Sequence, residues 1–350
     1  MAGTATAVVD RRRCGTGGCR VGVRLFELED LGERLPQVLK PAARRARDLV
    51  DGNWPSEVAV RRLARTPRDP RTFSEKVRYR AAFDRRPILT SMVDKVAVRD
   101  YVRERLGDEV LTPVVGAFDD PGRIPWRELP REYVVKATHG SGAVVVVFDG
   151  APAGNRLPGS ARFCEWERFA VRPEHASPPR IVALGRRWLE LDYSHSPGHV
   201  PEWGYRDVPR RVLVEHLVPG TGGELPTDYK FMCFDGTCPL FYVVGGRFTD
   251  HRIAVFDGDG SPSAIRFGPH PDKEHPPLVP HWRELKAAAE ELSRGLDFVR
   301  VDIYPVGTGM AFGEMTMYHD GGRNSWEPAS ADELIGSWWK VPDDSVLRGD

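Results

Sequence analysis

The chain reads YVVKATHGSGAVVVVF from residue 133 to residue 148, and this stretch decides the fold. Two runs rich in β-branched residues, 133–135 and 143–148, flank a short polar segment that contains two glycines. Such runs predict two strands joined by a glycine-rich loop. Lys136 stands at the mouth of the loop, and Gly140 and Gly142 let backbone amides approach an anion without a Cβ in the way. The pattern is typical of a phosphate-binding loop.

Lysine is scarce in this chain, which makes the position of Lys136 informative. Of the 50 lysines and arginines, only eight are lysine. Arginine is forked and planar, whereas lysine carries a compact charge, so the two are not interchangeable against a phosphate. The alternative interpretation is that an arginine-rich composition left a lysine here by chance.

Composition and charge exclude several classes of function. The chain has 50 basic and 50 acidic residues, so its net charge gives no case for binding nucleic acid or an anionic membrane. No segment has the roughly 18 apolar residues of a membrane span, and the first 20 residues lack the apolar core of a signal peptide. Five scattered cysteines suit a reducing compartment, and Cys14 and Cys19 have no second pair to complete a metal site. We therefore expect a cytoplasmic protein.

The periodicity of apolar residues predicts an α+β fold in four segments. These are a flexible leader at 1–22, a helical N-terminal element at 23–110, a central lobe with the glycine loop at 111–214, and a C-terminal lobe at 215–350. Helices are predicted at 27–50, as one helix or as a pair broken at Pro41, and at 72–83, 90–106 and 281–292. Strands are predicted at 110–118, 133–136, 143–148, 180–184, 211–217, 230–234, 240–244, 253–256, 298–304 and 310–315.

The last two predicted strands each deliver one carboxylate. Alternation places Arg300 and Asp302 on one face of the first strand, and Glu314 and Thr316 on one face of the second. Two carboxylates among apolar neighbours are costly to bury unless a cation lies between them. Mg²⁺ is the candidate, since it takes few carboxylates together with phosphate oxygens. The alternative is an exposed pair that forms a salt bridge with Arg300.

The strand predicted at 211–217 ends near Glu215 and runs into a loop of glycines and prolines. Backbone groups at such a strand end suit an adenine ring, and a nearby acid suits ribose hydroxyls. The alternative is an ordinary strand with Glu215 solvated at its end.

Taken in order, these blocks resemble the ATP-grasp superfamily, and more closely its TupA-like branch, named for teichuronopeptide synthesis. The resemblance covers roughly residues 70–339, and several blocks in the right order are more specific than any single one. The blocks are Thr72-Phe73-Ser74-Glu75-Lys76, Val93-Asp94-Lys95-Val96-Ala97-Val98-Arg99, residues 135–142, Val214-Glu215-His216-Leu217, residues 228–236, Phe298-Val299-Arg300-Val301-Asp302 and Phe312-Gly313-Glu314-Met315-Thr316.

The resemblance implies an ATP-grasp fold with ATP and Mg²⁺ bound between two β-rich lobes. It assigns the phosphates to Lys95, Lys136 and Lys230, and to the loop residues His139, Gly140, Ser141 and Gly142. It assigns adenine recognition to the hinge residues Glu215, His216 and Leu217. It assigns Mg²⁺ to Asp302, Glu314 and Thr316, and stabilisation of the transferred phosphoryl group to Arg300, together with Lys230 as a catalytic residue.

The chain departs from the family pattern in three places. Thr316 stands where many ATP-grasp enzymes have asparagine, which questions the third protein ligand to magnesium. Ala143 stands where the branch often has another glycine. His216 stands where a second acid is common, so the ribose contact is expected from Glu224 or from elsewhere.

The resemblance predicts an ATP-dependent carboxylate–amine ligase that forms an amide through an acyl phosphate, in cell-surface polysaccharide or specialised peptide biosynthesis. Its partners are then a small-molecule carboxylate and an amine. The candidates for holding the acceptor are Arg247, Arg252, His319 and Arg323; the alternative for any one of them is a solvated surface residue. Two alternatives remain open: a small-molecule kinase of the same fold that phosphorylates a hydroxyl, and a nucleotide-binding module without catalysis.

Overall fold

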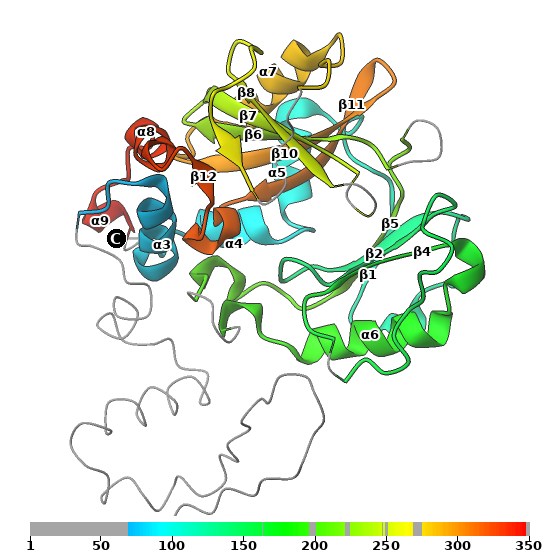
Figure 1. The fold of residues 1–350 in the computed structure, drawn as a ribbon. Helices are drawn as coiled ribbons and strands as arrows, with labels where there is room; N and C mark the ends of the chain where they lie inside the picture. The colour runs from blue at the N-terminus through cyan, green and yellow to red at the C-terminus, as the bar shows by residue number, and fades with distance from the viewer. Residues whose placement is uncertain are drawn as a thin grey trace, which may run out of the picture. The chain divides into compact units, whose positions relative to one another are not determined.

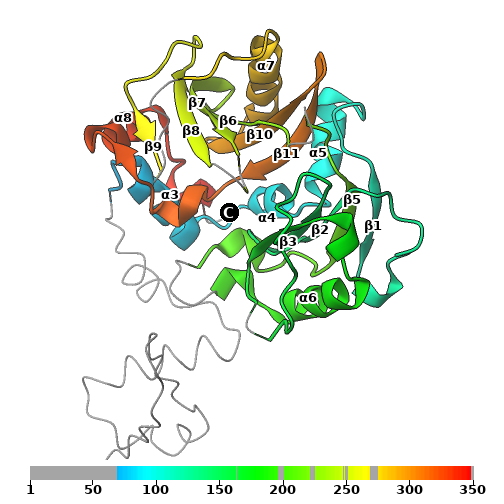
Figure 2. The same ribbon diagram turned by 45° about the vertical axis from the view of Figure 1, so that its right-hand side comes forward.

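The computed structural model describes residues 69–162, 164–195, 201–220, 225–246, 248, 251–268 and 275–347 (Figures 1 and 2). The predicted leader at 1–22, the helix predicted at 27–50 and the cysteines Cys14 and Cys19 lie outside these residues. Among the helices that are described, none has the length and apolar character needed to cross a membrane.

The first sheet carries the glycine loop. Its strands are β1 (Val114–Phe118), β2 (Tyr133–Ala137), β3 (Val144–Val147), β4 (Arg168–Val171) and β5 (Val212–His216), in the order β1-β5-β2-β3-β4. Strands β2 and β3 are antiparallel, with Lys136 opposite Val144, so the loop between them projects from one end of the hairpin. The hairpin predicted around the loop is confirmed.

Alternation along β2 and β3 separates the two faces of this sheet. Val135, Val145 and Val147 are buried in a core with α6 (Pro178–Glu190), which lies across one face (Figure 1). Val134 and Val146 lie on the opposite face. One face is therefore closed by a helix, and the other is left for the site.

The strand predicted at 180–184 is wrong, because these residues belong to α6. Four consecutive apolar residues suggested a strand. The helix instead begins at Pro178, a residue favoured in the first turn of helices, and Ile181, Leu184 and Trp188 follow at helical spacing, all with 1% exposure or less. Strand β4 was not predicted.

The second sheet carries the two carboxylates. Its strands are β6 (Asp228–Phe234), β7 (Thr237–Gly245), β8 (Arg252–Asp257), β10 (Val299–Val306) and β11 (Gly309–Thr316), in the order β11-β10-β6-β7-β8. All neighbours are antiparallel. Helix α7 (Trp282–Ser293) packs its apolar face on β6 and β10. A short pair, β9 (Arg266–Phe267) and β12 (Trp326–Glu327), lies beside this sheet (Figure 2).

Helix α3 (Phe73–Phe83) confirms the helix predicted at 72–83, and it begins at a capping box. The Thr72 hydroxyl accepts from the Glu75 amide at 3.2 Å, and the Glu75 carboxylate accepts from the Thr72 amide at 3.1 Å.

The single helix predicted at 90–106 is two helices, α4 (Pro87–Val93) and α5 (Val98–Leu106). Asp94 separates them, because its carboxylate accepts from the Val96 amide at 2.8 Å and so competes with helical hydrogen bonding. The turn between the helices presents Lys95.

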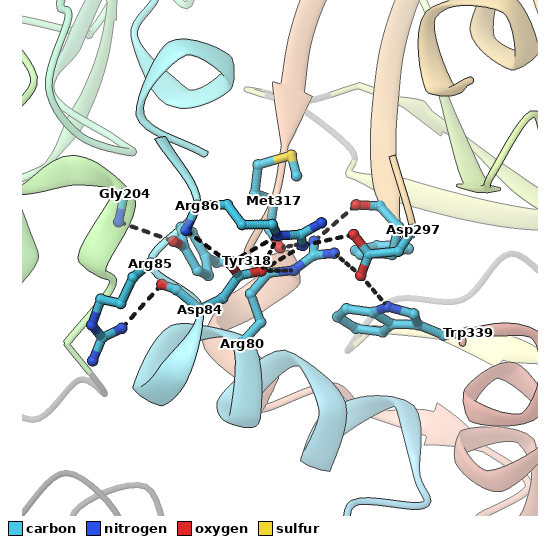
Figure 3. A network of polar contacts seen from close by, with 10 residues as sticks. Arg80, Asp84, Arg85, Arg86, Gly204, Asp297, Met317, Tyr318 and Trp339 are labelled. Atoms are coloured by element: carbon cyan, nitrogen blue, oxygen red, sulfur yellow. Dashed lines mark hydrogen bonds and ion pairs between the residues drawn. The ribbon is translucent and has the colours of Figure 1, made fainter. Parts of the chain in front are cut away.

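A buried group of charges joins α3 to the second sheet and to α8 (Ser330–Trp338). Arg80, at 1% exposure, donates to the carbonyls of Phe298 and Met317 and to Asp297 at 2.6 Å (Figure 3). Asp297 also accepts from the Trp339 indole at 2.7 Å. The last helix among the described residues is the short α9 (Asp344–Leu347).

Candidate functional site

A cavity of about 210 Å³ is lined by residues of both sheets. The first sheet contributes the face of β2 and β3 that α6 leaves uncovered. The second contributes residues of β6, β7, β10 and β11. The chain also reaches the cavity through the turn after α4, the glycine loop and the segment after β5.

One part of the cavity is apolar. Its lining comes from alternate residues of β2 and β3, from the segment after β5, and from the end of β7 and the residues beyond it. These residues are Val134, Val144, Val146, Phe148, Leu217, Val218, Leu225, Val244 and Phe248. Such a lining suits an apolar part of a ligand.

The lining also contains charged side chains. It contains three cations and three carboxylates: Lys95, Lys136, Arg168, Glu215, Asp228 and Glu314. Lys136 and Glu215 form an ion pair at 2.6 Å, with side chains 18% and 13% exposed. Lys136 and Glu215 lie on adjacent strands, β2 and β5, which explains how a predicted phosphate contact and a predicted hinge residue come together.

Lys95 connects three predicted parts of the site. Its ammonium group donates to the Gly140 carbonyl at 2.6 Å and lies 3.9 Å from the Glu314 carboxylate. Burial lowers the pKa of Lys95, and the nearby Glu314 carboxylate acts in the opposite direction. The turn after α4 therefore places one lysine between the glycine loop and an acid of β11.

The two predicted metal acids lie side by side, because Asp302 of β10 is opposite Glu314 of β11. Asp302 is 2% exposed and also lies opposite Lys230 of β6. Arg300 donates to both Asp302 oxygens, at 2.7 and 2.8 Å, and to the Thr316 hydroxyl at 2.9 Å. The salt bridge with Arg300 exists, but it is buried rather than exposed as the alternative interpretation supposed.

Lys230 lies between two carboxylates. It donates to Asp302 and is 2.7 Å from Asp228. Burial alone would raise the pKa of Asp302, but Arg300 and Lys230 outweigh it and hold that pKa at about 2. Burial likewise opposes ionisation of Glu314, and the nearby Lys95 lowers its pKa overall. Both acids are therefore ionised at neutral pH.

The donor set of this cluster fits a magnesium ion that arrives with a phosphate. Two adjacent ionised carboxylates and the Thr316 hydroxyl are hard oxygen donors, and Mg²⁺ typically takes one or two carboxylates together with substrate phosphates. Within the described residues, no group of three or more acidic, histidine or cysteine side chains is arranged to hold a metal alone. In this structure the chain's own cations contact the acids instead.

Only part of the glycine loop lines the cavity. Ser141 and Gly142 line the cavity, whereas His139 does not. The His139 side chain is buried, and its Nε2 atom lies 3.0 Å from the Trp188 carbonyl of α6. Burial lowers the pKa of His139 to about 4, so the ring is neutral. We therefore assign His139 to holding the base of the loop.

The other predicted site residues are divided between the cavity and places away from it. His216 and Leu217 line the cavity with Glu215. His319 is fully buried, 3.0 Å from the Tyr242 hydroxyl, with a pKa that burial lowers to about 4. Arg252 and Arg323 are exposed and do not line the cavity. Arg247 and Glu224 lie outside the described residues.

Three residues with polar side chains at the cavity were not predicted as site residues: Arg168, Asp228 and Tyr304. Arg168 reaches the site because β4 pairs in parallel with β3, which places Arg168 opposite Val144. In a chain with so many arginines, no local pattern distinguishes this one. Asp228 was quoted only as the neighbour of Lys230, and its place at the start of a strand was the available signal.

A family model described as TupA-like ATPgrasp matches residues 75–152 and 187–340. This is well over half of the chain, so the protein belongs to the TupA-like ATP-grasp family, and its α+β fold is an ATP-grasp fold. The resemblance inferred from the sequence is confirmed. A search of curated protein sequences found no match.

Several solved structures are similar at low sequence identity. The ATP-grasp ligase PsnB, complexed with a phosphomimetic variant of its minimal precursor, Mg and ADP, is 11% identical with a TM-score of 0.35, over 75% of this chain and 59% of that chain. D-alanine–D-alanine ligase from Bacillus anthracis, complexed with ATP, is 12% identical with a TM-score of 0.36, over 66% and 56%. D-cycloserine synthetase DcsG is 14% identical with a TM-score of 0.36, over 72% and 70%. The chain thus spans about 59% of the length of the first of these ligases.

Proposed function

We propose that this protein is an ATP- and Mg²⁺-dependent carboxylate–amine ligase that forms an amide through an acyl phosphate. The observation that carries the proposal is one cavity lined by apolar residues, three cations, two residues of the glycine loop and Glu314, which lies opposite the buried Asp302. Membership of the TupA-like ATP-grasp family supports the choice of ATP as the ligand.

The adenine ring would lie in the apolar part, beside Leu217 and Phe248. The triphosphate would extend toward Lys95, Lys136 and Arg168, under the glycine loop. Lys136 is then released from Glu215 to contact the phosphates, which leaves the Glu215 carboxylate for the ribose hydroxyls. A compact ammonium group suits such an exchange of partners better than a forked guanidinium group does.

Asp302, Glu314 and Thr316 would hold the magnesium ion, which, when bound, neutralises phosphate charge. Arg300 and Lys230, both in contact with Asp302, orient that carboxylate. Lys95 lies between Glu314 and the glycine loop, where its charge faces both the acid and the phosphates.

The reaction itself needs no protein nucleophile. A substrate carboxylate oxygen attacks the γ-phosphorus and ADP leaves, which gives an acyl phosphate. An amine then attacks the acyl carbon, phosphate leaves, and the amine gives up a proton. The protein contributes charge stabilisation, orientation and exclusion of water. A cytoplasmic location supplies the ATP, and the pathway we propose is cell-surface polysaccharide or specialised peptide assembly.

The test is to incubate the protein with Mg²⁺-ATP and a panel of uronic acids, amino acids and amines, and to measure phosphate release together with product mass. The ligase predicts ADP, phosphate and a new amide that appear only when both acceptors are present. A stable phosphomonoester from a single acceptor would instead identify a kinase. Tight ATP binding with no product from any acceptor would identify a binding module.

A further inference from the structure

The residues at 153–186 lie between the two stretches that the family model matches. Family membership therefore says nothing about the part that this segment has in the site. The segment contains Trp166, a half-buried residue with a left-handed backbone, φ 50°. Trp166 lies directly against the glycine loop.

The contact between Trp166 and the loop leaves no space for a side chain. A Cβ atom added at Gly140 would lie 2.3 Å from Cζ3 of the Trp166 ring, and the next two closest atoms also belong to that ring. A Cβ atom added at Gly142 would lie 2.0 Å from the Trp166 carbonyl oxygen. Gly142 has φ 88°, whereas Gly140 has no positive φ. Gly140 is therefore required by the tryptophan ring rather than by its own backbone conformation.

The opposite side of the loop is held as well. The Gly140 carbonyl accepts from Lys95 at 2.6 Å, and Ser141 and Gly142 line the cavity. The loop thus passes between a lysine of the site and the Trp166 ring. A shift of the ring would change where the loop amides point.

Trp166 is in turn supported by a series of aromatic rings. Its ring centroid lies 4.8 Å from that of Tyr193, which lies 4.7 Å from Tyr205, which lies 6.2 Å from Tyr318. The first two contacts are edge-to-face, a favourable arrangement for aromatic pairs. Tyr318 follows β11, the strand that carries Glu314. The series therefore connects the loop of the first sheet with the acid-bearing strand of the second.

We propose that Trp166 is a positioning residue that holds the glycine loop in its place over the cavity, with Tyr193 as its support. This proposal rests on the proposed function only for the identity of the loop's ligand, which is the triphosphate of ATP. Trp166 acts through the loop and does not contact the reacting atoms.

The first test compares the effect of Gly140→Ala in the wild type with its effect in a Trp166→Ala background. Gly140→Ala in the wild-type background forces the ring or the loop to move, and we expect about a 10-fold loss of affinity for Mg²⁺-ATP, as over-packing costs of this kind imply. In the Trp166→Ala background the added methyl group has space, so the same change costs less than about 2-fold. Gly142→Ala is the matched control, because its contact is with backbone and it stays costly in both backgrounds. Equal costs of Gly140→Ala in both backgrounds would overturn the proposal.

The second test measures the loop without any nucleotide. We expect hydrogen exchange of the amides at 137–143 to be about 10-fold faster in Trp166→Ala and close to wild type in Trp166→Phe, which retains a ring. Trp126→Ala is the control, since Trp126 packs on the same core as Trp166, whereas the atoms that limit space at Gly140 and Gly142 belong to Trp166. Unchanged exchange in Trp166→Ala, or equal acceleration in Trp126→Ala, would contradict a positioning role. Failure of the wild type to bind ATP would refute the proposed function and leave this result standing.

Discussion

Two groups of charges lie near strand β10, and they are built differently. The structural cluster consists of Arg80, Asp84 and Arg86, in α3 and just after it, and of Asp297, just before β10 begins (Figure 3). The site cluster consists of Lys95, Lys230, Arg300, Asp302 and Glu314, further along the strand and its neighbours. Only the site cluster contains lysine, the scarce cation of this chain.

The difference lies in what surrounds each cluster. Arg80 is enclosed by carbonyls, by Asp297 and by the Trp339 ring, whose centroid lies 4.4 Å from the guanidinium carbon. Glu314 and Lys95 instead line the cavity, with the Glu314 side chain 35% exposed. A planar guanidinium group suits fixed contacts, and a compact ammonium group suits contacts that a ligand exchanges. We infer that the first cluster stabilises the fold and the second serves the ligand.

The largest effect is expected when the structural cluster is broken. Arg80→Ala leaves Asp297 and Asp84 buried with less compensation, so the free energy of unfolding should fall by about 3–5 kcal/mol. Chemical denaturation measures this loss. Arg186→Ala is the control, because its pair with Asp120 at 3.2 Å is exposed and should contribute less than about 1 kcal/mol. Equal losses of unfolding free energy in both variants would contradict a stabilising role specific to the buried cluster.

A change in the site cluster should instead lower activity and leave stability almost unchanged. Glu314→Gln is expected to lower turnover by about 10²- to 10³-fold, as the loss of one electrostatic contact to the transferred group does. Its unfolding free energy should change by less than about 1 kcal/mol, because Glu314 is partly exposed and its closest cation is 3.9 Å away. Asp302→Asn is a less specific probe, since it also leaves the buried charges of Arg300 and Lys230 without their carboxylate partner. Full turnover in Glu314→Gln would exclude this acid from the reaction.

As the pH falls, His139 should reduce the stability of the fold before Asp302 begins to titrate. The folded-state pKa of His139 is lowered to about 4, so the unfolded chain binds a proton first as the pH falls. Stability contributed by the neutral ring is present above the ordinary histidine pKa and is lost on the way down to pH 4, at roughly 1.4 kcal/mol per unit. Denaturation of wild type and His139→Asn between pH 7 and about 4 measures this loss. Parallel curves would show that His139 titrates normally in the fold.

A smaller effect is expected from a change that keeps the charge. Lys136→Arg should weaken ATP binding by about 10-fold, because the guanidinium group is bulkier and forms a more persistent pair with Glu215. Isothermal titration calorimetry measures the affinity. The matched control is Lys286→Arg, which lies on α7 and pairs with Glu290. Unchanged affinity in Lys136→Arg would mean that lysine at this position is an accident of composition.

Much of the site could be predicted because its signals are local. Alternation predicted one acid on each of two neighbouring strands, and the strand register places Asp302 opposite Glu314. The β2–β3 hairpin places Lys136 beside the loop, as predicted. What could not be predicted depends on long-range packing. Arg168 reaches the cavity only through the pairing of β4 with β3, and His139 turns inward because α6 offers the Trp188 carbonyl. The helix at 178–190 was missed because its apolar run is as short as a strand.

The measurement that tests the account most directly is the affinity of ATP with and without Mg²⁺, for wild type and Glu314→Gln. If the acids of β10 and β11 bind magnesium together with the phosphates, Mg²⁺ should strengthen ATP binding to the wild type by at least about 10-fold. In Glu314→Gln this enhancement should largely disappear, while the affinity for ATP alone should stay close to that of the wild type. Failure of the wild type to bind ATP, or an undiminished magnesium effect in Glu314→Gln, would contradict the account.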